Sequence, residues 1–431
     1  MNTRPQFASS TPLSKLPPQI YYVHPLMLKG LQDWRQVFAH AKDLGFDTVL
    51  SAPLFARGAD TSIFVSGDLD RLDPALGLGE SVDDGVKALT GAAKEHGNKL
   101  MLDIAIDRIA DASNQGSAVV FDPRRSPQES GSRTIDITHE TQLLDDWRRR
   151  LARLAGLGIA GFRCIGIGKV APDVWKGLIA AARSAVSDTV FLAWTPGTSF
   201  EDRKALKGVG FDGSFSSFAW WNMEERWILD EYEVQRELGY QITFPEAPFG
   251  KRMAHGIDGT EVSERRAVRA LKLASTFASG LMVPMGFEYG SSIPLDPLTG
   301  DGMGLRGLKD QGVFDLSSDI RAINAAPNKT SAGFGRQPLR LISTSQTQAV
   351  ALLQTDHEDI RASSKIRVVM LNRDLRRVTK APFNVLREAA SPFLPLTAPG
   401  NDADIFAPDL MLKPGELRVF EGHASQPIIE A

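Results

Sequence analysis

Between Ile20 and Ala325 there are eight short apolar runs, and all but one of them are followed by a longer amphipathic stretch. Apolar runs such as 20–23, 99–106 and 281–287 predict strands that are buried on both faces. Strands that alternate with helices form parallel sheets with crossover helices. Eight such units favour a closed barrel, for which about 250 residues are typical. An open doubly wound sheet is the alternative, but no glycine-rich phosphate loop follows the first strand.

The same pattern predicts the bounds of the individual elements. The expected strands are 20–23, 47–52, 99–106, 160–165, 189–193, 212–218, 240–244 and 281–287. The expected helices are 31–44, 81–96, 138–156, 172–186, 222–238, 263–279 and 316–325. After the third strand, a loop rich in Asp, Ser, Pro and Arg interrupts the pattern at about 108–136. Its length and composition predict a surface excursion, and long loops in compact domains are often functional.

The pattern of apolar and polar residues changes after Pro327, where short apolar runs follow one another with no helices expected between them. The expected strands are 339–343, 349–354, 366–372 and 417–420, and Pro-Gly pairs punctuate them. We therefore expect an α/β chain with three parts: an N-terminal tail (1–15), a TIM (β/α)8 barrel (16–330) and a C-terminal antiparallel β-sandwich (331–431).

The composition is that of a soluble globular protein, with 42% hydrophobic and 23% charged residues. A formal net charge of −3 gives no reason to expect nucleic acid or an anionic membrane as a partner. The single cysteine, Cys164, rules out a disulfide within the chain and suits a reducing, cytoplasmic location. The first fifteen residues lack the apolar core of a signal peptide. We expect no metal and no other cofactor, because no Cys/His ligand spacing occurs.

Four segments at expected strand ends resemble, in order, the signature motifs of the α-amylase superfamily, glycoside hydrolase family 13. These segments are LDIAIDR (102–108), GFRCI (161–165), VFLAW (190–194) and FPEAPFG (244–250). The run at 68–77 also resembles the segment that lies near the donor sugar in that family. Within the family, the sequence pattern is similar to that of the maltosyltransferases that use maltose 1-phosphate. Lys169 stands at about the place where those enzymes carry a lysine.

The resemblance implies that three catalytic carboxylates are missing. Retaining glycosidases need a carboxylate nucleophile and a carboxylic acid placed about 5 Å apart across the scissile bond. The position of the family's nucleophile holds Ile165, and that of its acid/base holds Trp194. Phe249 stands where a third aspartate would bind the sugar hydroxyls. None of these side chains can attack, protonate or bind in the family's manner.

Other polar and aromatic side chains remain near the expected mouth of the barrel. The polar ones are Asp103, Asp107, Arg163, Glu246 and Glu288. They form either a new polar site with Lys169, or inherited ion pairs and ordinary loop residues. Trp220 and Trp221 follow the sixth strand and are either glucan contacts or core residues, since indole rings serve both purposes.

The leading hypothesis is a pseudoenzyme of the α-amylase family that binds α-glucan or malto-oligosaccharide, or acts as a scaffold, in α-glucan metabolism. One alternative is an active glycosidase or maltosyltransferase that uses relocated carboxylates. A third reading is a structural subunit that pairs with an active homologous enzyme.

Overall fold

The computed structural model describes residues 17–59, 62–111, 132–255, 259–277, 279–298, 300, 302–326, 337–344, 348–390, 397–398, 401–404 and 409–423. Within these residues, eight parallel strands close into a barrel in the order β1-β12-β11-β10-β9-β8-β5-β2. The strands are β1 (Ile20–Val23), β2 (Thr48–Ser51), β5 (Lys99–Ala105), β8 (Gly161–Ile165), β9 (Val190–Ala193), β10 (Gly213–Phe215), β11 (Tyr240–Thr243) and β12 (Gly280–Pro284). The expected TIM barrel is therefore confirmed, and the open sheet is excluded.

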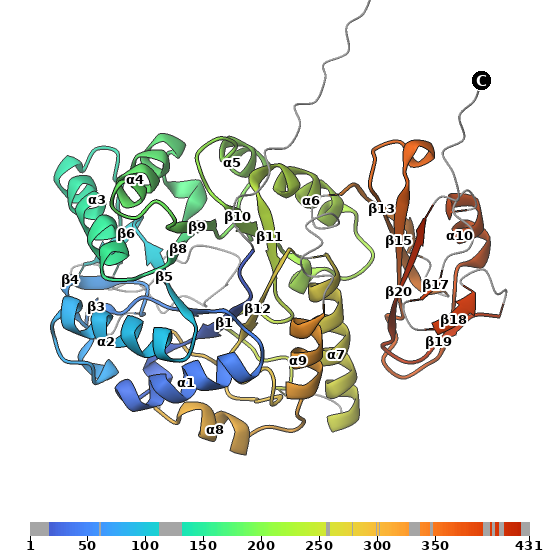
Figure 1. Cartoon of the computed structure of the whole chain (residues 1–431), viewed down its shortest axis with the longest axis horizontal. Coiled ribbons are helices and arrows are strands. Elements are labelled where there is room, and N and C mark those ends of the chain that lie inside the picture. Colours follow the sequence, from blue (N-terminus) through green and yellow to red (C-terminus); the bar gives the residue numbers. More distant parts are fainter. Residues whose placement is uncertain are drawn as a thin grey trace, which may run out of the picture.

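Helices surround the barrel, as Figure 1 shows. They are α1 (Leu31–Asp43), α2 (Val82–Glu95), α3 (Thr141–Gly156), α4 (Pro172–Ala185), α5 (Phe200–Ala205), α6 (Trp227–Leu238), α7 (Thr260–Phe277), α8 (Gly304–Asp310) and α9 (Ser317–Ala325). Among the described residues, no helix is both long and apolar enough to cross a membrane.

Local sequence signals account for several of these boundaries. The Ser81 hydroxyl accepts a hydrogen bond from the backbone N–H of Asp84 and caps α2, which also has acidic residues in its first turn. Pro172 opens α4 at the first helical position, where its missing N–H costs nothing. Gly239 ends α6 with a φ of 140°, and a Cβ there would lie 2.1 Å from the carbonyl oxygen of Asp212. Only glycine permits so sharp a return into β11.

Two boundaries differ from the sequence prediction. Helix α6 begins at Trp227 rather than at 222, because the Asn222 side chain accepts hydrogen bonds from the N–H groups of Glu224 and Glu225. Asparagine commonly stabilises such turns at the expense of helix. The short helix α5 between β9 and β10 was not predicted.

The predicted excursion at 108–136 lies partly outside the described residues. Its two ends pair as an antiparallel ribbon of β6 (Arg108–Ala110) and β7 (Ser132–Thr134). A second ribbon, of β3 (Phe55–Arg57) and β4 (Ser66–Leu72), lies in the connection after β2.

The chain after the barrel forms an antiparallel sheet, whose six described strands run in the order β13-β14-β15-β20-β17-β18. They are β13 (Leu339–Ser343), β14 (Val350–Thr355), β15 (Lys365–Leu371), β20 (Leu417–His423), β17 (Thr397–Ala398) and β18 (Asn401–Asp404). A smaller ribbon pairs β16 (Thr379–Lys380) with β19 (Met411–Leu412). The predicted absence of helices is wrong, because α10 (Phe383–Ala390) lies between β16 and β17. The division at 330/331 falls outside the described residues and stays a prediction.

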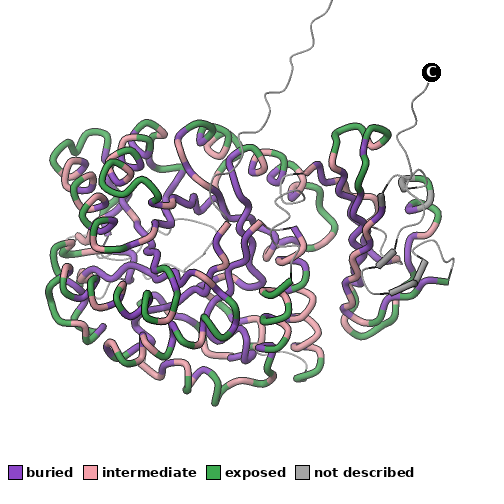
Figure 2. Tube along the Cα trace, in the orientation of Figure 1, coloured by how far each residue is buried: buried purple, intermediate pink, exposed green. Residues whose placement is uncertain are grey.

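Side chains alternate between the two faces of this sheet, so each face has its own core. One face of β14 and β15 packs beneath Leu386 of α10 and Leu412 of β19. The other face packs against helices α6 and α7 of the barrel, so the sheet stands beside these helices in Figure 1. Figure 2 shows the buried residues that follow the strands of both units.

Phe277 lies in the contact between the barrel and the sheet. Its side chain is fully buried and stacks on Phe218 at a ring-centroid distance of 5.3 Å. We expect Phe277→Ala to lower the free energy of unfolding by about 3–5 kcal/mol, because it leaves a cavity in a packed core. Urea denaturation measures this, with Val378→Ala at an exposed position as the matched control. Equal stability of the two variants would contradict the packed contact.

Candidate functional site

A buried ion pair occupies the interior of the barrel. Asp103 of β5 and Arg163 of β8 are register partners on neighbouring strands. The guanidinium donates from Nε to Oδ1 and from Nη2 to Oδ2, each at 2.6 Å. The hydroxyl of Tyr22 on β1 donates to Oδ2 at 2.8 Å. Burial raises the pKa of Asp103, and the donors from Arg163 and Tyr22 oppose that shift.

Aromatic rings enclose the cation of this pair. The Arg163 Cζ atom lies 4.5 Å from the ring centre of Tyr22, 4.6 Å from that of Trp194 and 5.3 Å from that of Phe215. Arg163 is only 1% exposed. A desolvated guanidinium gains about 2 kcal/mol from such a ring face, which offsets part of the cost of burial. The pair is therefore held inside a cage and is not presented to solvent.

Trp194 follows β9 and forms one wall of that cage. Its ring stacks on Phe244 at 5.3 Å and lies 5.2 Å from Phe215. Its backbone N–H donates to the Cys164 carbonyl at 2.9 Å, which extends the strand pairing of β8 with β9. The side chain is buried.

Phe249, in the loop after β11, is likewise buried and packs over Tyr22. Its ring meets Tyr22, His24 and Phe64 edge to face, at centroid distances of 5.7, 5.5 and 5.2 Å. Trp194 thus contacts Arg163 and Phe249 contacts Tyr22, so both rings pack against the same buried group.

Ile165 ends β8 and is half-buried against the main core. Gly166 follows it with a φ of 75°, and a Cβ there would lie 2.6 Å from the carboxyl carbon of Asp107. The chain therefore turns tightly across Asp107, and a larger residue could not replace this glycine without displacing the carboxylate. Asp107 accepts two hydrogen bonds from its neighbour Arg108, at 3.0 and 2.8 Å. Lys169, further along the same connection, is exposed.

The structure does not bring Glu288 to the barrel interior. Its Oε1 accepts from the Tyr21 hydroxyl at 2.6 Å and lies 2.9 Å from Nε2 of His40 in α1. Tyr21 and Tyr22 are successive residues of β1, so their side chains leave opposite faces of the strand. Glu288 is therefore on the helix side of β1, whereas Asp103 is on the interior side.

Glu246 is also held in a buried ion pair. Its Oε1 lies 2.8 Å from Nε of Arg252, and its Oε2 accepts from the N–H of Met253. The Arg252 side chain continues to the Met285 carbonyl at 3.1 Å. Glu246 is 6% exposed, and burial raises its pKa, against the opposing effect of Arg252. Glu246 thus holds the 246–253 segment together through its contacts with Arg252 and the Met253 backbone.

The two tryptophans after β10 have different surroundings. Trp221 is buried in the core between the barrel and the C-terminal sheet, and its Nε1 donates to the Glu225 carbonyl at 2.8 Å. Trp220 is half-buried, meets Phe244 edge to face at 5.4 Å, and lines an open cavity of about 530 Å³. Among the described residues, no cluster of three or more His, Cys, Asp or Glu side chains could hold a metal ion.

Known proteins resemble this chain in sequence and in fold, although no family model matches it. Over 402 residues, the chain is 30% identical to an alpha-1,4-glucan:maltose-1-phosphate maltosyltransferase of Burkholderia pseudomallei. The match covers 87% of this chain and 34% of the relative, so the chain spans about a third of that protein's length. The sequence likeness and the shared fold together support the resemblance to the α-amylase superfamily.

Solved structures of the superfamily share the fold. A trehalose-6-phosphate hydrolase of Bacillus licheniformis superposes with a TM-score of 0.67 at 12% identity, covering 95% of this chain and 99% of that one. An α-amylase of Lactobacillus plantarum superposes with a TM-score of 0.64 at 16% identity, covering 94% and 98%. At these identities the likeness establishes the fold.

Sequence reasoning missed the ring cage around Arg163. Tyr22 lies on β1, Phe215 lies on β10 and Trp194 follows β9, and these rings were not predicted to meet. A usable signal existed, since inward-facing aromatic residues at the ends of neighbouring barrel strands must converge. Superfamily motifs direct attention to the carboxylate positions and not to these neighbours.

We expect Arg163→Met to destabilise the protein by about 3–5 kcal/mol, because it leaves the Asp103 carboxylate buried without its cation. Adding Asp103→Leu should recover part of that loss, because it removes the unpaired charge. Chemical denaturation of the two single variants and the double variant measures the coupling. Additive losses would show that the pair contributes no coupling energy.

The raised pKa of Glu246 predicts that the stability of the folded protein depends on pH. Its folded-state pKa lies above the ordinary value of 4.5, so the folded protein retains a proton that the unfolded chain has released. The contribution of Glu246 to stability therefore falls as the pH rises from about 4.5 through the folded-state pKa. In urea titrations, the stability of the wild type relative to Glu246→Gln should decrease across this window. A relative stability that increases with pH would contradict the raised pKa.

Proposed function

We propose that this chain is a non-catalytic member of the α-amylase superfamily that binds malto-oligosaccharide or acts as a scaffold in α-glucan metabolism. One observation carries the proposal. Trp194 and Phe249, which stand where the resemblance places two carboxylates, pack as rings around the Arg163–Asp103 pair and Tyr22. Rings therefore occupy the place where a reacting sugar would need carboxyl oxygens.

The chemistry of the superfamily requires these oxygens. Retaining α-glycosyl transfer needs one carboxylate to attack the anomeric carbon and a second carboxyl group to protonate the leaving oxygen. Ile165, Trp194 and Phe249 offer neither a nucleophile nor a transferable carboxyl proton. Removing one member of such a group often costs nearly as much activity as removing all of them. Burial of each large apolar side chain instead contributes about 1.5–3 kcal/mol to folding.

Three of the remaining candidate carboxylates give little support to a relocated active site. Asp103 is fully buried and bound by Arg163, and Glu246 is bound by Arg252. Glu288 is bound by Tyr21 and His40 on the helix side of β1. An acid and a nucleophile must both face one sugar, and these three groups face separate partners.

The relative suggests the ligand class and the setting. A maltosyltransferase that acts on α-1,4-glucan and maltose 1-phosphate matches most of this chain, which favours a malto-oligosaccharide as ligand. An active homologous enzyme is the protein partner that this proposal favours, with cytoplasm as the compartment. A net charge of −3 favours neither nucleic acid nor an anionic membrane.

The proposal predicts binding without turnover. The purified chain, incubated with maltose 1-phosphate plus maltohexaose, with starch, or with an aryl α-glucoside, should release no phosphate, reducing ends or phenol above a mock purification. Isothermal titration with maltoheptaose should show saturable binding. Turnover that follows the chain through purification, and is abolished by Glu246→Gln, would establish the alternative enzyme instead.

A further inference from the structure

Two cavities adjoin on the outside of the barrel, where the short helix α5 faces α6. One has a volume of about 530 Å³ and is lined by residues after β9 and β10. The other has a volume of about 540 Å³ and runs along α6. Phe200 and Asp230 line both cavities. We call this continuous depression the α5–α6 groove, and pockets of roughly 300–1,000 Å³ are typical of small-ligand sites.

Trp220 and Trp227 line the first cavity and are both half-buried. Trp220 packs against the barrel core, whereas Trp227 packs against the separate core beneath the C-terminal sheet. The Trp227 Nε1 donates to Oε2 of Glu225 at 2.9 Å, which fixes the orientation of its ring. Two indoles anchored on different cores thus leave part of their surface to one cavity. Rigid indole faces stack on sugar rings at little entropic cost.

A buried polar cluster supports the same cavity. Glu231 is 2% exposed and accepts hydrogen bonds from the Ser217 N–H and hydroxyl and from Arg203. The distances are 2.6, 2.8 and 2.9 Å. The cluster ties the loop after β10 to both α5 and α6. The cavity is therefore preformed and does not depend on a ligand for its shape.

The charges around the first cavity disfavour an anion. Its lining includes three acids, Glu225, Asp230 and Glu231, and one base, Arg203. That base is already bound to Glu231. Carboxylates repel a phosphate group but accept hydrogen bonds from the hydroxyls of a neutral sugar. The lining therefore suits an uncharged polyol better than a sugar phosphate.

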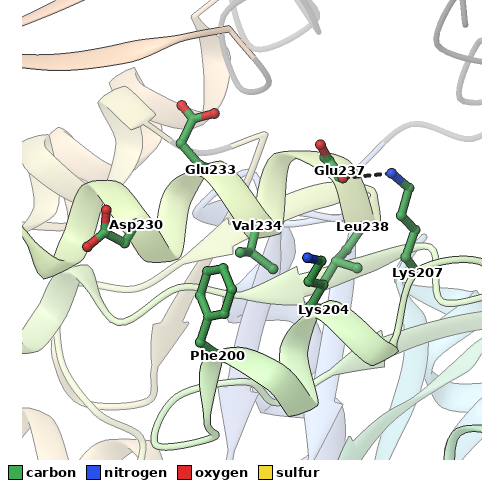
Figure 3. A pocket seen from close by; sticks show the side chains of 8 residues that line it. All are labelled: Phe200, Lys204, Lys207, Asp230, Glu233, Val234, Glu237 and Leu238. Carbon is green, nitrogen blue, oxygen red and sulfur yellow. Dashed lines mark hydrogen bonds and ion pairs between the residues drawn. The ribbon is translucent and has the colours of Figure 1, made fainter. Parts of the chain in front are cut away.

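The second cavity also has more acids than bases, with Asp230, Glu233 and Glu237 against Lys204 and Lys207. Figure 3 shows Phe200, Val234 and Leu238 between the two helices, with charged side chains at the edges. Lys207 and Glu237 bridge one edge at 2.8 Å. Phe200 is 44% exposed, an unusual state for so large an apolar side chain. An apolar strip with hydrogen-bonding groups on both sides matches the ring faces and edge hydroxyls of a glucan chain.

We propose that the α5–α6 groove binds a neutral malto-oligosaccharide across both cavities, away from the filled interior of the barrel. The choice of a glucan ligand rests on the proposed function, whereas the location and the preference for an uncharged ligand rest on the groove itself. A chain that reaches from Trp227 to Phe200 and beyond contacts more of the groove than a disaccharide does. Longer oligosaccharides therefore bind more tightly.

Isothermal titration with maltose, maltoheptaose and maltose 1-phosphate tests this. Maltoheptaose should bind about tenfold more tightly than maltose, and maltose 1-phosphate should bind no better than maltose. Trp227→Ala and Phe200→Ser should each weaken maltoheptaose binding about three- to tenfold, as expected when a stacking ring is lost. Trp227→Phe should restore part of the affinity.

Met411→Ala, at an exposed apolar site on β19, is the matched control and should bind as the wild type does. Thermal unfolding of each variant checks folding, and Phe200→Ser changes an exposed side chain if Trp227→Ala proves unstable. Unchanged maltoheptaose affinity in folded groove variants would overturn the groove while leaving glucan binding by the chain intact. No binding of maltoheptaose by the wild type would overturn both the groove and glucan binding by the chain.

Discussion

The bidentate pair between Asp103 and Arg163 is the interaction on which the interior of the barrel depends. It joins neighbouring strands β5 and β8 at one register position, and it is removed from water. A buried charge pair is tolerated only when its remaining polar atoms and faces are satisfied. Tyr22 supplies a hydrogen bond, and the rings of Tyr22, Trp194 and Phe215 supply the faces. The aromatic side chains therefore complete an electrostatic requirement as well as a packing one.

The barrel could be predicted from the sequence because its signal is local and repeated. Strand 99–105 is an apolar run, and the longer helices are amphipathic, with a capping serine at the start of α2. Asp103 and Arg163 were expected at strand ends near the mouth of the barrel, either in a new polar site or as an inherited ion pair. The helix α10 was missed although it is amphipathic, because its eight residues are fewer than the roughly 11–18 over which a helical period is usually counted.

The contacts of the remaining carboxylates could not be read from the sequence. Glu288 meets Tyr21 across 267 positions and His40 across 248, and nothing local indicates which face of β1 it reaches. The α5–α6 groove also could not be predicted, because it depends on contacts between residues that pack on different cores. Its indoles are seven residues apart, but one packs on the barrel core and the other on the core beneath the sheet. Only the packing of the C-terminal sheet against the barrel sets the positions of these two indoles relative to each other.

The central proposal is that none of the carboxylates that the structure describes acts as a glycosyl nucleophile. Cyclitol epoxides of glucose configuration alkylate the nucleophilic carboxylate of retaining glucosidases, so they report that function without a substrate assay. Intact-mass spectrometry after prolonged incubation, beside an active α-glucosidase, measures the adduct directly. The account predicts full labelling of the active enzyme and no added mass on this chain. A stoichiometric adduct on Asp103, Glu246 or Glu288 would contradict it.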